Sequence, residues 1–159
     1  DELAGLTPAR FVGEGPRVGP RMNISDVMTA NPTTCPTTAS LFDAARAMRD
    51  EAIGDVLVCD ADQRLVGIVT DRDLVVRGFA TSGSESLTLA DVCSNDLTTV
   101  SLDAEPRDVI RLMSDRAIRR VPVCDDDQRP VGIVSLGDLA ARLDEQSVLG
   151  HISSAPPDA

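Results

Sequence analysis

The chain of 159 residues has a net charge of −11, and all 15 of its cationic residues are arginine. Hydrophobic residues make up 42%, which excludes wholesale disorder, whereas aromatic residues make up only 2%. Nucleic acid is disfavoured as a partner, because an acidic surface repels a phosphate backbone and single strands bind to aromatic side chains.

The same composition excludes a membrane span and argues against a metal site. No apolar run approaches the roughly 18 residues that a transmembrane helix needs, and no apolar signal region precedes the first predicted element. The four cysteines form no C-x-x-C pair, and the only histidine is His151. We therefore expect free thiols, no metal, and a soluble protein of the reducing cytoplasm.

The first predicted elements follow a stretch without periodicity. Residues 1–21 contain many glycines and prolines and are predicted to be a flexible lead-in. An extended, proline-punctuated piece is expected at 32–36. A helix is predicted at 40–51 from its apolar spacing, with Ser40 and Asp43 as an N-cap pair.

The next elements form a strand pair followed by a helix. Short apolar strands are expected at 56–59 and 65–69, joined by a polar turn at 60–63. A second helix is predicted at 70–79, directly after the second strand. The order of elements is therefore β-α-β-β-α, which predicts a small mixed sheet with helices packed on one side.

This order returns without a gap at an offset of 65 residues. Residues 53–74 and 118–139 are identical at 14 of 22 aligned positions. We expect two equivalent units, repeat 1 at 22–86 and repeat 2 at 87–148, in a mixed α/β (α+β) fold packed through its sheets, with a flexible tail at 149–159. The second copy is predicted to contain an extended piece at 97–101, helices at 106–117 and 136–144, and strands at 121–124 and 130–134.

Each copy contains the pattern G-h-h-[ST]-x-x-D where its second strand meets its last helix, at 67–73 and 132–138. One interpretation is a helix N-cap, in which the hydroxyl caps the first turn and the aspartate faces the positive end of the helix dipole. The other is a nucleotide site, in which the hydroxyl holds a phosphate and the aspartate accepts hydrogen bonds from a ribose. The pattern alone leaves both interpretations open.

The tandem units, the paired motif and the run Arg119–Val123 resemble the CBS domain pair, or Bateman module, over residues 22–145. The chain is most similar to small bacterial proteins of this family that have no enzyme domain. The resemblance implies a regulatory module without catalytic activity, a disc-like homodimer, and an unidentified partner protein that it regulates. It also implies up to two adenosyl ligands between the repeats: AMP, ADP, ATP, S-adenosylmethionine or an NAD-type dinucleotide.

Carried onto this chain, the resemblance implies two ligand sites. The stronger predicted site consists of Thr33, Thr34, Ile53, Gly54, Arg119, Arg120, Val121, Pro122, Ser135 and Asp138. The weaker predicted site consists of Thr70, Asp73, Thr98, Thr99 and Ile118.

The predicted ranking rests on charge. Arg119 and Arg120 are expected to meet the phosphates, whereas the aligned residues of the first copy are Gly54 and Asp55. An ordinary solvated strand edge remains an alternative for the two arginines. Because Asp55 and Gly137 weaken the motif, a scaffold of the same fold that binds no nucleotide is the alternative function. A nucleotide hydrolase is disfavoured, since no metal-binding carboxylate cluster or catalytic base is evident.

Overall fold

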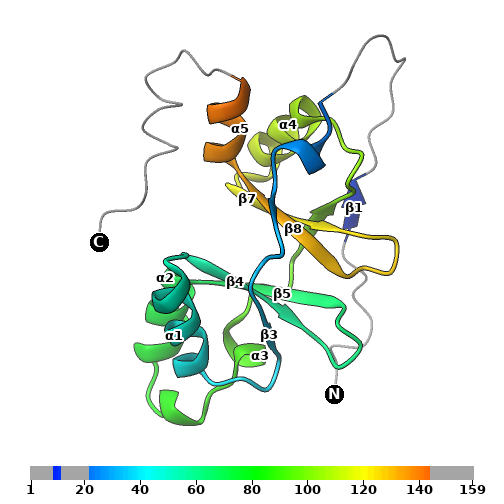
Figure 1. Cartoon of the computed structure of the whole chain (residues 1–159). Helices are drawn as coiled ribbons and strands as arrows, with labels where there is room; N and C mark the ends of the chain where they lie inside the picture. Colours follow the sequence, from blue (N-terminus) through cyan, green and yellow to red (C-terminus); the bar gives the residue numbers. More distant parts are fainter. Residues whose placement is uncertain (1–8, 12–21, 144–159) are drawn as a thin grey trace. The chain divides into compact units, whose positions relative to one another are not determined.

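The computed structural model describes residues 9–11 and 22–143, which form two compact units (Figure 1). The first unit comprises Pro32–Leu97, and the second combines residues 22–31 with residues 98–143. Helices and strands alternate in both units, so the predicted mixed α/β class is confirmed.

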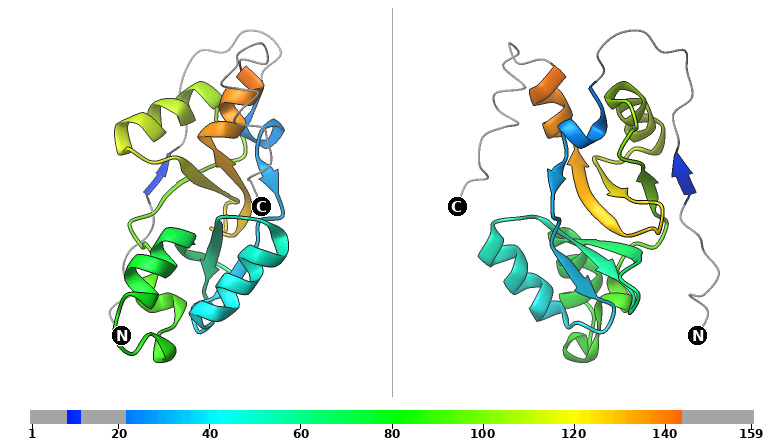
Figure 2. Two further views of the ribbon diagram at one scale, coloured as in Figure 1. Left: turned by 90° about the vertical axis from the view of Figure 1, so that its left-hand side faces the viewer. Right: turned by 45° about the vertical axis from the view of Figure 1, so that its right-hand side comes forward.

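The first unit is built on a three-stranded sheet in the order β3-β4-β5. β3 runs parallel to β4, and β4 runs antiparallel to β5. The helices pack against one face of this sheet through a common hydrophobic core (Figure 2). The elements are β3 (Thr34–Pro36), α1 (Leu41–Glu51), β4 (Asp55–Cys59), β5 (Leu65–Thr70), α2 (Asp71–Asp73), the π-helix η2 (Leu74–Phe79), the 3-10 helix η3 (Ser84–Ser86) and α3 (Leu89–Val92).

The second unit is built on a five-stranded sheet in the order β1-β6-β7-β8-β2. Its central part repeats the first unit, with β6 parallel to β7 and β7 antiparallel to β8. The elements are β1 (Ala9–Phe11), the 3-10 helix η1 (Ile24–Asp26), β2 (Thr29–Ala30), β6 (Thr98–Val100), α4 (Pro106–Arg116), β7 (Arg120–Cys124), β8 (Pro130–Ser135) and α5 (Leu136–Leu143).

Local chemistry explains where these elements begin and turn. The predicted cap of α1 is present, because the Asp43 amide donates to Ser40 Oγ at 3.1 Å and the Ser40 amide donates to the Asp43 carboxylate at 3.1 Å. In the β7–β8 turn, Asp125 Oδ1 accepts from the amides of Asp127 and Arg129 at 3.0 and 2.9 Å. Asp60 does the same in the β4–β5 turn, so each of these aspartates stabilises the turn that it begins.

The N-terminal segment of each repeat packs in the unit that contains the main part of the other repeat. β2 pairs with β8 through Thr29 and Ile133, and Figures 1 and 2 show this blue segment beside β8. At the aligned positions of the first unit, Ser94 forms a bridge with Ile68. The two repeats therefore exchange their N-terminal segments reciprocally.

The two hydrophobic cores confirm this exchange position by position. Ile24 and Val27 are buried in the core of the second unit, and their aligned residues Leu89 and Val92 are buried in the core of the first. Apart from Leu41 in one core and Ala104 in the other, every core residue has a core counterpart 65 positions away. Because each core needs a segment from the neighbouring repeat, neither repeat can complete its core alone.

The remaining predicted elements agree with the structure in position. The predicted helix at 70–79 is present as α2 followed by a π-helical turn, in which the Ala80 amide donates to the Val75 carbonyl. Ala9–Phe11 form a strand within the predicted lead-in. The rest of the lead-in, the predicted tail at 149–159 and His151 lie outside the described residues.

Candidate functional site

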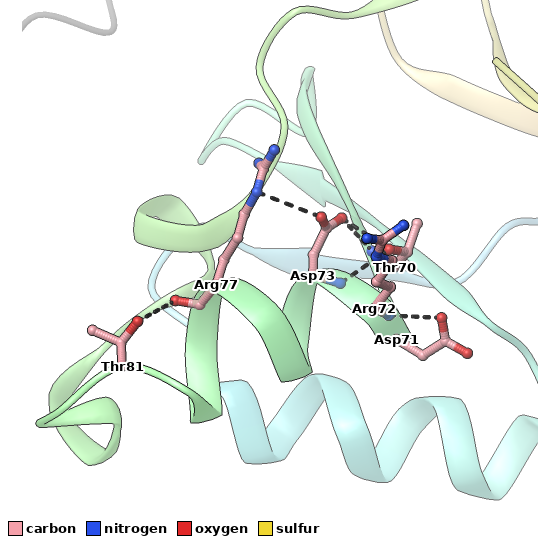
Figure 3. A network of polar contacts seen from close by, with 6 residues as sticks. All are labelled: Thr70, Asp71, Arg72, Asp73, Arg77 and Thr81. Atoms are coloured by element: carbon pink, nitrogen blue, oxygen red, sulfur yellow. Dashed lines mark hydrogen bonds and ion pairs between the residues drawn. The ribbon is translucent and has the colours of Figure 1, made fainter. Parts of the chain in front are cut away.

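The motif of the first copy forms a closed capping arrangement at the start of α2 (Figure 3). Oδ2 of Asp73 accepts hydrogen bonds from the Thr70 amide at 2.9 Å and from the Thr70 hydroxyl at 3.0 Å. In return, the Asp73 amide donates to Thr70 Oγ1 at 3.2 Å. The cap interpretation of the motif is therefore confirmed here, and it uses only one oxygen of the carboxylate.

The motif of the second copy forms the same cap at the start of α5. Oδ2 of Asp138 accepts from the Ser135 amide at 2.9 Å and from the Ser135 hydroxyl at 2.7 Å. The Asp138 amide donates to Ser135 Oγ at 3.0 Å. A cap accounts for Oδ2 but leaves Oδ1 of Asp138, for which the described residues supply no hydrogen-bond or ion-pair partner.

The second carboxylate oxygen distinguishes the two copies. Oδ1 of Asp73 lies 3.7 Å from Nε of Arg77, one turn further along the helix. The aligned arginine, Arg142, instead donates to the main-chain oxygen of Asp26 at 3.5 Å. Both oxygens of the Asp73 carboxylate thus have partners, whereas one oxygen of the Asp138 carboxylate has none among the described residues.

The amides of the first helical turn also have more partners in the first copy than in the second. In both copies the first of these amides donates to the residue before the middle strand: Asp71 to the Gly54 carbonyl at 3.0 Å, and Leu136 to the Arg119 carbonyl at 2.8 Å. The next amide of the first copy donates to the Asp71 carboxylate at 2.7 Å. Its counterpart, the Gly137 amide, has no acceptor within residues 22–143.

The strand pairing brings part of each predicted site together within its unit. Arg120 pairs directly with Ser135 across β7 and β8, and the exposed Arg119 precedes it. In the first unit, Asp55 takes the place of Arg120 opposite Thr70. The phosphate end predicted for the second copy is therefore cationic, and that of the first copy carries a carboxylate. The predicted combinations of residues from both units remain predictions.

Several residues predicted near the base differ in accessibility. The Thr33 hydroxyl donates to the Glu51 carboxylate, whereas Thr34 is exposed. Thr98 and Thr99 are buried, and the Thr99 hydroxyl has no hydrogen-bond partner among the described residues. Val121 and Pro122 are also buried, while Ile53, Gly54 and Ile118 are half-buried. Val121 lies in the hydrophobic core, so only its main chain is available to a ligand.

The first glycine of each motif has a packing role that the sequence reasoning missed. A Cβ at Gly132 would overlap the Met28 sulfur and lie 3.1 Å from the Thr29 carbonyl oxygen. A Cβ at Gly67 would lie 2.6 Å from Sγ of Cys93. Because Met28 and Cys93 are themselves aligned at the repeat offset, the alignment contained a signal for this contact.

The cysteines show no sign of a site in the described part of the chain. All four are free, and burial raises the pKa of the Cys59 thiol from 9.0 to about 11, with Asp60 adding to the effect. Burial also raises the pKa of the Cys93 thiol, although Arg77 opposes this rise. No cluster of histidine, cysteine and carboxylate residues suited to a metal ion occurs among the described residues.

Comparison with known proteins identifies both repeats. The model of the CBS domain family matches residues 24–77 and 89–145. The chain is 40% identical to the uncharacterized protein YlbB of Bacillus subtilis over 125 residues, which cover 78% of this chain and 82% of that protein. It is 32% identical to hypoxic response protein 1 of Mycobacterium tuberculosis over 130 residues, which cover 81% and 90% of the two chains.

Solved structures of CBS pairs have the same fold. The CBS domain pair of protein MJ0100, in complex with 5′-methylthioadenosine and S-adenosyl-L-methionine, is similar with a TM-score of 0.72 and 26% identity over 80% of this chain and 100% of that one. Hypoxic response protein I, with two coordinated zinc ions, is similar with a TM-score of 0.68 and 32% identity over 76% and 98%. The predicted fold class is thereby confirmed.

Proposed function

Because this chain belongs to the CBS domain family, whose paired domains are regulatory modules, we propose that it is a nucleotide sensor without catalytic activity of its own. The half-site of Ser135 and Asp138 binds the adenosyl ligand, and ligand binding alters the activity of a partner protein. A ligand has this effect when it binds one arrangement of the module better than another. The observation that carries the proposal is Oδ1 of Asp138, for which the described residues supply no partner, in the copy where Arg120 pairs with Ser135 across β7 and β8.

The chemistry of this half-site fits a nucleoside with an anionic substituent. A carboxylate oxygen without an intramolecular donor accepts hydrogen bonds from ribose hydroxyls. Arg119 and Arg120 supply guanidinium groups that bind phosphate through charge-assisted, forked hydrogen bonds. The adenosyl ligands of the similar MJ0100 pair support the ligand class, and AMP, ADP, ATP and NAD are the members of it whose phosphates the arginines would bind.

The test measures binding by calorimetry with AMP, ADP, ATP, S-adenosylmethionine and NAD. We expect Asp138→Asn to weaken binding at least tenfold, because the amide still accepts from Ser135 but presents a donor where the ribose needs an acceptor. The matched control, Asp73→Asn, changes the same atom in the other copy and is expected to leave affinity within twofold. Equal losses in both variants would contradict the assignment.

A second test concerns the phosphate end. Arg120→Ala is expected to weaken AMP and ATP binding while leaving adenosine binding unchanged, because adenosine has no phosphate. Unchanged affinity for every ligand would assign Arg120 to an ordinary strand edge.

We also propose that the protein is a homodimer. Phe42 on α1 and Phe79 on η2 are 50% and 39% exposed, and their ring centroids lie 5.3 Å apart. Val75 and Val76 extend this exposed apolar face. At the position aligned with Phe42 the second copy has the exposed Arg107, so the described residues of the second copy do not repeat the Phe42–Phe79 contact. Sedimentation of a Phe42→Arg variant as a monomer would support the dimer, and an unchanged mass would contradict it.

The same face supports the alternative function, a scaffold that binds no nucleotide. Binding of none of the adenosyl ligands at millimolar concentration would favour this alternative. In the described residues no helix is long and apolar enough to cross a membrane. The four free cysteines support the proposed cytoplasmic location, since thiols persist in a reducing compartment.

A further inference from the structure

The half-site of the first copy contains an ion pair that has no counterpart among the described residues of the second copy. Nε of Arg77 lies 3.7 Å from Oδ1 of Asp73, and Figure 3 shows the arginine side chain directed at this carboxylate. The other oxygen, Oδ2, already accepts two hydrogen bonds from Thr70. Both oxygens of the carboxylate that would bind a ribose in this copy therefore already have partners, Thr70 and Arg77.

The aligned arginine of the second copy is held elsewhere. Arg142 donates to the main-chain oxygen of Asp26, which belongs to the exchanged N-terminal segment. The backbone also differs, because Arg77 lies in the π-helix η2 whereas Arg142 lies in the regular helix α5. Two arginines at equivalent sequence positions thus face different acceptors.

We propose that Arg77 competes with ribose hydroxyls for Oδ1 of Asp73 and weakens the binding of adenosyl ligands at the first-copy half-site. Arg142, bound to Asp26, leaves the second-copy half-site open. This inference rests on the proposed function, since it takes the motif aspartate as the ribose acceptor. It identifies Arg77, in addition to Asp55, as a residue that makes the two copies unequal.

The expected effect is modest because the ion pair is partly exposed. The Arg77 side chain is 55% exposed and the Asp73 side chain 19%. Pairs of this kind are weak and are screened by salt. We therefore expect loss of the competitor to tighten ribose binding about two- to fivefold.

The experiment isolates the first-copy half-site and uses adenosine, which carries no phosphate and so does not sense the nearby charges. In the full chain with Asp138→Asn, adenosine affinity is measured by calorimetry or, at millimolar affinity, by chemical-shift titration. Adding Arg77→Gln is expected to tighten binding two- to fivefold. The matched control, Arg142→Gln, changes the aligned arginine and is expected to leave the affinity unchanged.

Salt gives a second readout that a purely structural role of Arg77 would not affect. Raising the salt concentration from 50 to 500 mM is expected to tighten adenosine binding when Arg77 is present, because salt screens the competing ion pair. In Arg77→Gln the same change is expected to have no such effect. A melting curve of each variant establishes that the fold is intact.

Two results would overturn the inference. Equal or weaker adenosine binding in Arg77→Gln would show that Arg77 does not compete, and weaker AMP binding with unchanged adenosine binding would make Arg77 a phosphate ligand. These results differ from failure of the proposed function, in which the wild-type chain binds no adenosyl ligand at all.

Discussion

Replacing Gly132 by alanine tests the exchange of segments between the repeats. Gly132 does not have a positive φ, so alanine on its own would be tolerated there and would reduce the entropy of the unfolded chain. The new Cβ would however overlap the Met28 sulfur and lie 3.0 Å from Cγ of Met28 and 3.1 Å from the Thr29 carbonyl oxygen. The exchanged segment therefore determines the sign of the effect.

The magnitude follows from these opposing terms. Overpacking a closed contact costs about 1–3 kcal/mol, while Gly→Ala without strain gains about 0.4–1 kcal/mol. We expect Gly132→Ala to lower the free energy of unfolding by about 1–2 kcal/mol. For Gly67→Ala we expect at least the same loss, because the Cβ of Cys93 at 2.9 Å is fixed to the backbone and cannot swing aside as Met28 can.

The assay is urea unfolding of the wild type, Gly132→Ala, Met28→Ala and the double variant. Met28→Ala removes the overlapping sulfur, so the double variant is expected to be more stable than the sum of the single effects predicts, by about 1 kcal/mol. An alanine at 132 that leaves stability unchanged or raises it would refute the reasoning. Strict additivity with Met28→Ala would refute the assigned contact.

Three further predictions concern single groups. Thr99→Val is expected to stabilise the fold by about 1 kcal/mol, since it removes a buried hydroxyl for which the described residues supply no partner, whereas Thr34→Val at the exposed aligned position is expected to change thermal stability little. The Cys59 thiol has a pKa of about 11 in the folded protein and about 9.0 in the unfolded chain, so the free energy of unfolding is expected to fall as pH rises between these values. Urea unfolding at several pH values is expected to show a less steep fall in Cys59→Ala. Ala117 ends α4 with a φ of 52°, and Ala117→Gly is expected to raise the stability measured by thermal unfolding by about 0.5–1 kcal/mol.

Elements were predictable from the sequence because each carries a local signal. The Ser40–Asp43 cap and the apolar spacing of α1 determine that helix with short-range chemistry alone. The aspartates that begin the strand turns, Asp60 and Asp125, also act within four residues. Because the sequence repeats at an offset of 65 residues, the predictions for one copy could be checked against the other.

The exchange of N-terminal segments was not predictable from these signals, because it depends on contacts between residues distant in sequence, such as the pairing of Thr29 with Ile133. The offset pattern is the same whether Ile24 and Val27 pack in their own repeat or in the neighbouring one. The partners of the two motif carboxylates, Asp73 and Asp138, were not predictable from the sequence either. Arg77 and Arg142 are aligned and identical, and only the local backbone decides which acceptor each one reaches.

The exchange also explains why the copies differ where they do. Since each core contains residues from both repeats, a substitution at a core position in one repeat must fit the packing of the other, and the core residues stay matched at the repeat offset. The first helical turn after the motif hydroxyl is free of that constraint: Asp71 and Arg72 in one copy are Leu136 and Gly137 in the other. Asp71 accepts from the Arg72 amide in the first copy, whereas the Gly137 amide of the second copy has no acceptor among the described residues. A fold that binds its repeats together through their cores can therefore vary the first helical turns of its two half-sites independently, while the different acceptors of Arg77 and Arg142 account for the asymmetry at Asp73 and Asp138.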